Sequence, residues 1–282
     1  MEAYILKPGA DVLSRNIDDY PEGIIIPIDK PYRWTSADVI RKIKFAAIRH
    51  FGKKNLKVGH AGTLDPLATG VLLVCIGKAT KLAETLQSHD KEYVAGVTFG
   101  ATTPSYDLEK EIDRFFPHEH ITAEAVRAAL PAFIGEQDQV APLFSAKSVD
   151  GVRAYELARK LHKDGKSLDE AASELIRVSR INITDLELLD YSNAVKDNGS
   201  GNEESVSKAS SRINVTDNSA LGLPRAEIRM ACSKGTYVRA FARDLGEALC
   251  TGAHLDSLQR SRSGIFRVED ALTVESAISL LA

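Results

Sequence analysis

The segment GHAGTLDPLATG, residues 59–70, is the most informative stretch of this 282-residue chain. Its glycines and its proline surround a single carboxylate, Asp65, between a basic segment and an apolar one. Glycine adopts backbone conformations that other residues avoid, so such a loop can hold a carboxylate at the edge of a strand. The pattern by itself leaves two interpretations open: a catalytic Asp65, or an aspartate that only caps a turn.

The residues before this loop predict a strand and then a helix. Residues 23–28 are apolar and largely β-branched, which is typical of a buried strand, and Pro31 ends it. Thr35 is followed three residues later by Asp38, which predicts a capping box. Apolar residues then recur at helical spacing as far as Phe51.

The residues after the loop alternate between predicted strands and helices without a regular period. Strands are expected at residues 71–76, 93–99, 178–189 and 226–232, and helices at residues 79–86, 122–133 and 154–162 and after Thr236 and Thr273. We therefore expect an α+β fold with a mixed sheet and packed helices, in preference to a doubly wound one. Residues 192–222 are rich in Ser, Asn, Asp and Gly, which predicts a polar, mobile insertion between two strands.

The composition is that of an ordinary soluble globular protein, with 44% hydrophobic and 27% charged residues and a net charge of −3. The sequence has neither a signal-peptide pattern nor an apolar run of the ~20 residues that cross a bilayer. We expect a cytoplasmic protein with no membrane partner. Cys75, Cys232 and Cys250 lack the spacing of a metal site or a disulfide framework, so we expect buried, reduced thiols and no bound metal.

Two segments are strongly basic. The first has nine basic residues against one acid between residues 30 and 60: Lys30, Arg33, Arg41, Lys42, Lys44, Arg49, Lys53, Lys54 and Lys57. The second contains Arg229, Lys234, Arg239, Arg243, Arg260, Arg262 and Arg267. A solvated charged surface is the simpler interpretation of these two segments. They flank candidate catalytic segments, however, which favours a polyanionic substrate.

Several motifs resemble, in order and approximate spacing, those of the TruB family of tRNA pseudouridine synthases. Besides the loop around Asp65 they are Asp29-Lys30-Pro31, Lys91-Glu92-Tyr93 and SKGTYVR at residues 233–239, with a further block, PLFSAKSVDGVRAYELAR, from Pro142. The matches extend over about residues 23–270. The resemblance implies the pseudouridine-synthase fold, in which a mixed, mainly antiparallel sheet with packed helices and loops surrounds a central cleft. It also implies an isomerase that converts uridine 55 in the T arm of tRNA to pseudouridine.

The resemblance also implies roles for individual residues. Asp65 is expected to be the nucleophile, Tyr93 to stack on the target uracil and to be a candidate for proton abstraction, and Arg239 to pair with the Asp65 carboxylate. His60 is expected to help the RNA loop adopt its flipped conformation. Weaker expectations, as contacts to the pocket or the RNA, concern Lys30, Gly59, Thr63, Lys81 and Tyr237.

The reaction itself explains why no cofactor is expected. The bond from the uracil nitrogen to the sugar breaks and a bond from C5 replaces it, without redox change or hydrolysis. A carboxylate could attack uracil C6 or sugar C1′, or assist loss of the C2′ proton, and the sequence leaves these routes open. The base must first leave its stack, and an aromatic side chain can recover part of that cost.

The chain departs from the family pattern in three ways. Its lysine in SAKSVDG is Lys147, where the family usually has the lysine one residue later, at Ser148. The polar insertion is atypical, and we expect a catalytic domain at residues 23–282 after an extension at residues 1–22, without the small C-terminal PUA domain of many relatives. We expect a monomer. Two rival hypotheses are a non-catalytic tRNA-binding or tRNA-folding protein on the same scaffold, and a hydrolase, which would need a second carboxylate.

Overall fold

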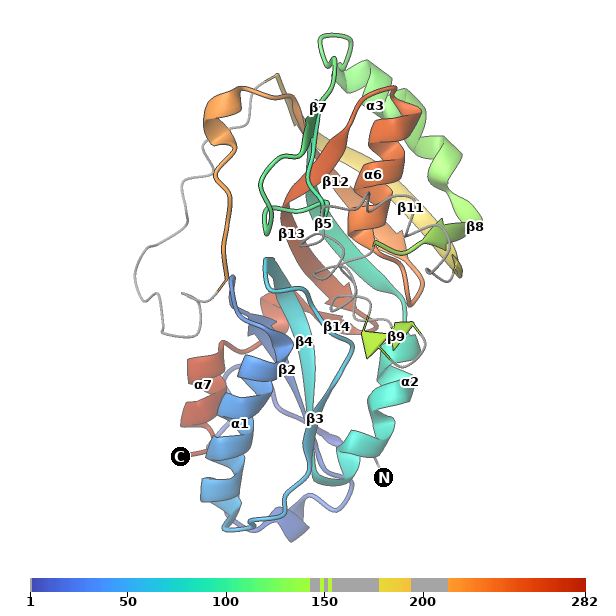
Figure 1. Ribbon diagram of the computed structural model, residues 1–282. Helices are drawn as coiled ribbons and strands as arrows, with labels where there is room; N and C mark the ends of the chain where they lie inside the picture. The colour runs from blue at the N-terminus through green and yellow to red at the C-terminus, as the bar shows by residue number, and fades with distance from the viewer. Residues whose placement is uncertain (1, 143–147, 150–151, 154–177, 194–212) are drawn as a thin grey trace. The chain divides into compact units, whose positions relative to one another are not determined.

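The computed structural model describes residues 2–142, 148–149, 152–153, 178–193 and 213–282 (Figure 1). The chain divides into two compact units. The first comprises Met1–Tyr93, Glu204–Ile213 and Leu258–Ala282, and the second comprises Val94–Glu203 and Asn214–Ser257. The expected α+β class is confirmed, since a large mixed sheet is accompanied by a small number of helices.

The first unit is built around strand β4 (Ala68–Ile76), which is almost entirely buried. Strand β2 (Ile24–Lys30) lies antiparallel along one edge of β4, and β1 (Tyr4–Ile5) adds to β2 in parallel. On its other edge β4 pairs with β13 (Ala253–Ser263) at its beginning and with β3 (Val58–Ala61) at its end. The loop that carries Asp65 joins β3 to β4, so it lies where the partner of β4 changes.

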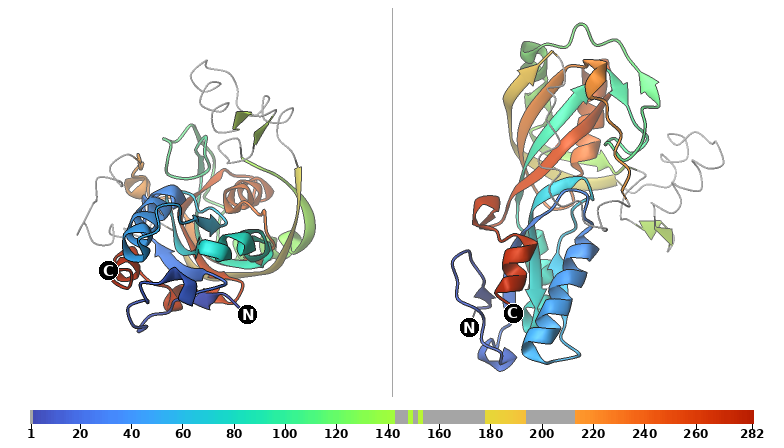
Figure 2. Two further views of the ribbon diagram at one scale, coloured as in Figure 1. Left: turned by 90° about the horizontal axis from the view of Figure 1, so that it is seen from below. Right: turned by 90° about the vertical axis from the view of Figure 1, so that its left-hand side faces the viewer.

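The helices of the first unit begin with α1 (Ser36–Phe51), whose predicted capping box is confirmed. The Thr35 hydroxyl accepts a hydrogen bond from the Asp38 amide at 3.1 Å, and the Asp38 carboxylate accepts one from the Thr35 amide at 3.1 Å. Helices α1 and α7 (Val274–Ser279) lie side by side (Figures 1 and 2). The other elements of the unit are the short 3-10 helices η1 (Ile17–Asp19), η2 (Gly77–Leu82) and η6 (Val268–Asp270), helix α2 (Ala83–Ser88) and strand β14 (Phe266–Arg267).

The second unit contains the sheet order β13-β5-β12-β11-β8. Its strands are β5 (Lys91–Phe99), β12 (Arg225–Cys232), β11 (Val178–Ser192) and β8 (Gly135–Val140), and β5 and β13 contain residues of both units. Strand β11 lies antiparallel to both β12 and β8. The remaining elements are helices α3 (Ala123–Ala129) and α6 (Val238–Ala248), 3-10 helices η3 (Leu130–Phe133) and η5 (Ser219–Leu221), and the strand pairs β6 (Ala101–Thr102) with β7 (Arg114–Phe115) and β9 (Ser148–Val149) with β10 (Val152–Arg153).

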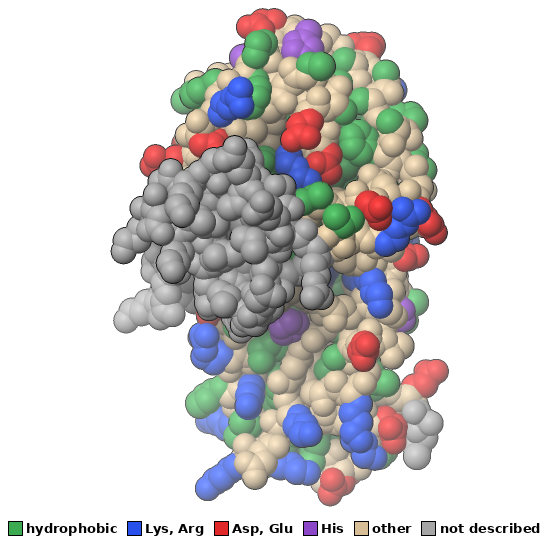
Figure 3. Space-filling view, turned by 45° about the vertical axis from the view of Figure 1, so that its right-hand side comes forward, with side chains coloured by type: hydrophobic (Ala, Val, Ile, Leu, Met, Phe, Trp, Pro, Cys, Tyr) green, Lys and Arg blue, Asp and Glu red, His purple; other side chains and the backbone are tan. Residues whose placement is uncertain are grey.

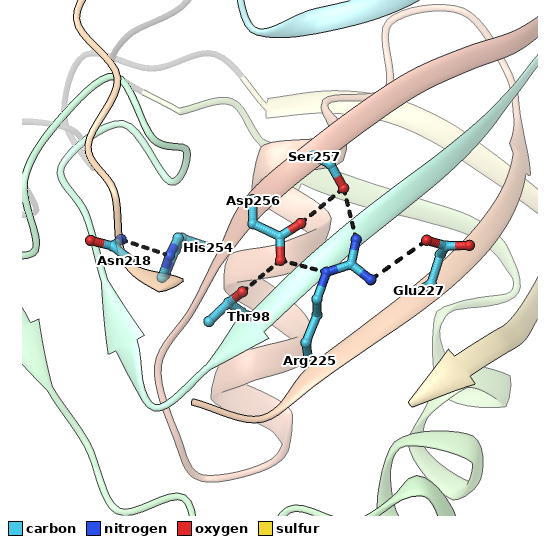
Figure 4. Close-up of polar contacts among 7 residues, drawn as sticks. All are labelled: Thr98, Asn218, Arg225, Glu227, His254, Asp256 and Ser257. Carbon is cyan, nitrogen blue, oxygen red and sulfur yellow. Dashed lines mark hydrogen bonds and ion pairs between the residues drawn. The ribbon is translucent and has the colours of Figure 1, made fainter. Parts of the chain in front are cut away.

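A buried ion pair joins the strands of the second unit (Figure 4). The Arg225 side chain is 6% exposed, and its Nε donates to Asp256 Oδ2 at 2.7 Å while Nη2 donates to Ser257 Oγ at 2.9 Å. The Thr98 hydroxyl donates to the same Asp256 oxygen at 2.8 Å. Gly96 makes room for this cluster, because a Cβ there would lie 2.0 Å from Asp256 Oδ1 and 2.2 Å from Arg225 Nη2.

Two local predictions differ from the structure. The helix predicted at residues 122–133 is α-helical only as far as Ala129, after which Pro131 lies in a 3-10 turn, because proline cannot donate the helical hydrogen bond. Cys75 and Cys232 are buried, but Cys250, which follows α6 with a positive φ of 54°, is exposed. The helix predicted at residues 154–162 and most of the predicted insertion lie outside the described residues.

Candidate active site

The loop around Asp65 is fastened to the protein on both sides of the carboxylate. The Ser36 hydroxyl, in the first turn of α1, accepts from the Leu64 amide at 3.0 Å and donates to the Leu64 carbonyl at 3.2 Å. The Ala68 amide donates to the Asp65 carbonyl at 3.1 Å, which forms a turn with Pro66 in its second position. The Asp65 side chain is half-exposed, so a fixed backbone presents a carboxylate that a substrate can reach.

Lys30 holds this loop through hydrogen bonds from its buried ammonium group. Its side chain is fully buried, and its ammonium donates to the carbonyls of Pro31 at 2.9 Å, Trp34 at 2.6 Å and Pro66 at 3.1 Å. Burial lowers the pKa of Lys30 from 10.5 to about 7, although the carboxylate of Asp65 counteracts this shift. Lys30 therefore has no exposed surface for an RNA phosphate, and its contacts are those of a support for the loop.

Arg260 is the second cation beneath the loop, and the sequence did not reveal its role. Although it belongs to the predicted basic cluster, its side chain is fully buried. Its guanidinium donates to the carbonyls of Val71 at 2.7 Å, Thr63 at 3.3 Å and Gly62 at 3.3 Å. The assignment of Arg260 to a phosphate-binding surface is therefore wrong; it holds the loop to β4. No strand was predicted around Arg260, so the sequence carried no signal for this role.

Gly70 allows the strand that carries Arg260 to approach β4. Its φ is +96°, and a Cβ at this position would lie 2.3 Å from the Arg260 carbonyl oxygen. The Gly70 amide donates to Asp29 Oδ1 at 3.0 Å. Burial raises the pKa of Asp29, although this hydrogen bond counteracts the shift. The two glycines with positive φ in the loop, Gly62 and Gly70, thus have the special backbone geometry that the sequence predicted.

The other predicted residues of the first unit lie on elements around this loop. His60 is half-exposed on β3, and burial together with the charge of Arg260 lowers its pKa, so the imidazole is neutral at pH 7. Gly59 is half-exposed beside it, while Thr63 and Lys81 are exposed. Tyr93, at the end of the first unit, is 9% exposed.

The second unit carries Arg239 and Tyr237. Arg239, in the first turn of α6, is buried, and its Nη1 donates to the Ser105 carbonyl at 3.1 Å. Its Nε lies 3.7 Å from Asp107 Oδ2. Half-buried Tyr237 forms the N-cap of α6, and its amide donates to Gln139 Oε1 at 2.8 Å. The sequence had suggested no chemistry for the segment that contains Asp107, because that residue meets Arg239 only through folding.

Lys147, the shifted lysine, lies outside the described residues. Among the residues that are described, no group of three His, Cys, Asp or Glu side chains could hold a metal ion. Within the same ranges, every helix is too short or too polar to span a bilayer.

The chain is similar in sequence to known proteins over most of its length. Residues 49–200 match the family described as TruB family pseudouridylate synthase, N-terminal domain. The tRNA pseudouridine synthase B of Phocaeicola vulgatus is 48% identical over 258 residues, which cover 92% of this chain and 93% of the relative. That of Flavobacterium johnsoniae is 40% identical, over 91% of this chain and 95% of the relative.

A solved structure shares the fold. A chain in the crystal structure of a Cbf5-Nop10-Gar1 complex aligns with a TM-score of 0.59 at 24% identity. The alignment covers 99% of this chain and 63% of that longer one, so this chain spans less than two thirds of its length. From the family match and these relatives together, the chain belongs to the TruB family of pseudouridylate synthases.

Proposed function

We propose that this protein isomerises uridine 55 in the T arm of tRNA to pseudouridine, with Asp65 as the nucleophile. The observation that carries the assignment of Asp65 is its loop, in which a half-exposed carboxylate stands on a backbone anchored by Ser36, Lys30 and Arg260. Relatives that are 40–48% identical over most of their length are named tRNA pseudouridine synthase B, which supports tRNA as the substrate.

The buried cations hold the loop that presents Asp65 to the substrate. Lys30 donates to the Pro66 carbonyl and Arg260 to the Thr63 carbonyl, on either side of Asp65 in the loop. The Asp65 carboxylate can attack the uracil or the sugar. The base then leaves C1′, rotates and bonds to the sugar through C5, and the bond to Asp65 breaks, which regenerates the carboxylate. The C5 proton leaves, the nitrogen gains a proton, and the atoms balance without a cofactor.

Two further residues are proposed to act on the substrate or on Asp65. Tyr93 would stack on the flipped uracil and so recover part of the cost of unstacking. Arg239 would pair with the Asp65 carboxylate. Its contacts to the Ser105 carbonyl and to the Asp107 carboxylate restrict the guanidinium, so less entropy is lost when it binds a carboxylate.

The test of the nucleophile is Asp65→Asn, assayed with tRNA that carries tritium at uridine C5. Isomerisation releases this tritium, hydrolysis would release free uracil, and a tRNA-folding factor would do neither. We expect the variant to release none while it still binds tRNA, because the phosphate contacts remain. The matched control is Asp11→Asn, the same substitution at an exposed position, which should keep wild-type activity. Tritium release by Asp65→Asn would disprove the assignment.

The setting of the reaction follows from its substrate. Because tRNA is cytoplasmic, we infer a cytoplasmic enzyme, and we infer that a monomer suffices because one chain contains every proposed catalytic residue. Gel filtration with light scattering measures the oligomeric state, and a stable dimer would contradict the second inference.

A further inference from the structure

A lysine-lined groove lies in the first unit, away from the buried cations under Asp65. One cavity of about 510 Å³ lies between the N-terminal segment, the loop after α1 and the 3-10 helix η2. A second, of about 500 Å³, shares with it Asn55, Leu56, Lys57 and Thr80 and extends to Gly59. Because Gly59 precedes His60 in β3, the groove leads towards the strand that continues into the Asp65 loop.

The groove is positively charged. Six lysines line the two cavities: Lys44, Lys53, Lys54, Lys57, Lys78 and Lys81. Among the residues that the structure describes, Asp18 is the only acidic one in either lining. Lys78 lies 3.6 Å from Glu22, with both side chains well exposed, a contact worth little in water. In the described part of the chain, the other five lysines have no carboxylate within 4.0 Å, so their charge is available to a ligand.

Its walls are folded elements of the protein. Tyr20, in the wall formed by the N-terminal segment, packs edge-to-face on Tyr4 with ring centroids 5.2 Å apart and on Phe51 at 6.2 Å. These contacts hold residues of the predicted extension against the end of α1. Figure 3 shows Lys and Arg side chains gathered over the lower part of the face that it draws, where Figure 1 places β3 and α2.

We propose that this lysine groove binds the sugar–phosphate backbone of the substrate RNA, outside the site that holds the target uridine. The inference rests on the proposed function. Lysine ammonium groups are point charges that neutralise phosphates without reading bases, and the groove offers six of them in two connected cavities. Residues 17–21 of the N-terminal segment are then part of the RNA-binding surface, and the groove contributes affinity for RNA of any sequence.

The test is the double variant Lys53→Glu/Lys57→Glu, and binding of a T-arm stem-loop RNA is measured at several salt concentrations. Each lost phosphate contact lowers the slope of log K against log salt by about 1, so we expect a slope smaller by about 2. The dissociation constant at low salt should rise by about tenfold or more. Lys53→Gln/Lys57→Gln, which removes the charges without reversing them, should give the same slope with a smaller loss of affinity.

The matched control is Lys7→Glu/Arg15→Glu. It makes the same change of charge at two exposed positions of the N-terminal segment that do not line the groove. Equal slopes for the groove variant and the control would overturn the proposal, since a general charge effect would then explain both. A competition experiment gives a second refutation. If polyglutamate displaces the RNA but an unrelated RNA of equal charge does not, the groove binds an acidic protein and not an RNA backbone.

Measurements of tritium release and of RNA binding together distinguish failure of the proposed function from failure of the proposed groove. If the wild-type protein releases no tritium from tRNA but the groove variant still loses two units of slope, the proposed function fails and the groove stands. If tritium release is normal and the slope does not change, the groove fails alone. Circular dichroism of each variant establishes that it is folded.

Discussion

Replacing Gly70 with alanine tests whether the close approach of β13 to β4 holds the Asp65 loop. The added Cβ would lie 2.3 Å from the carbonyl oxygen of Arg260 and 2.8 Å from its amide nitrogen. These are backbone atoms of a paired strand, so they cannot move aside as a flexible side chain could. We expect about 1–3 kcal/mol from this overlap and about 1–2 kcal/mol from the φ of +96°. The total is about 2–5 kcal/mol of unfolding free energy.

Gly52→Ala is the matched control. Gly52 ends α1 with a φ of +61°, and a Cβ there would have no atom within 4 Å. Its substitution therefore has only the backbone cost, about 1–2 kcal/mol. Urea denaturation of both variants measures the two losses, and tritium release normalised to the folded fraction measures the effect on the loop. Gly70→Ala should lose activity because displacement of Arg260 moves the carbonyls that it holds, while Gly52→Ala should not. Equal losses of stability, or full activity of Gly70→Ala, would refute this reasoning.

The remaining predictions concern buried charges. Because the pKa of Lys30 is about 7 in the folded protein and ordinarily 10.5, the unfolded chain binds more protons between these values. The unfolding free energy of the wild type relative to Lys30→Met should therefore rise with pH above 7, by up to about 1.4 kcal/mol per pH unit, and should not change with pH below pH 6. A difference in unfolding free energy that stays the same at every pH would contradict the prediction. Asp256→Ala leaves Arg225 buried without its strongest partner and should lower the unfolding free energy by about 3–5 kcal/mol. Glu227→Ala removes a half-exposed contact of 3.5 Å and should lower it by less than about 1 kcal/mol. Thermal or urea unfolding measures both losses.

Features that depend on neighbours in the sequence were predictable. The capping box of α1 involves residues three apart, and the positive φ of Gly62 and Gly70 follows from glycine's place in a loop. The strand after the loop was recognised because a continuous apolar run of that length is typical of a buried strand. The motif around Asp65 pointed to the family, and the comparisons confirmed it.

Features that depend on distant residues were not predictable in the same way. Cys250 was expected to be buried, but the turn after α6 exposes it. Asp107 lay in a segment without a recognised motif, and only the fold brings it to 3.7 Å from Arg239. The groove in the first unit joins lysines of the loop after α1 to lysines of η2, which are separated in the sequence by two strands.

The sequence alone determined that a carboxylate stands in a glycine-rich loop between a basic segment and an apolar strand, and that the fold is α+β. Tertiary structure decided which positive charges are buried supports and which face the solvent. Lys30 and Lys53 belong to one basic cluster, yet Lys30 is enclosed by carbonyls while Lys53 lines an open groove. The reason is that burial depends on contacts between residues far apart in the sequence. Arg260 donates a hydrogen bond to the carbonyl of Val71, 189 residues away, and no local sequence pattern predicts that contact.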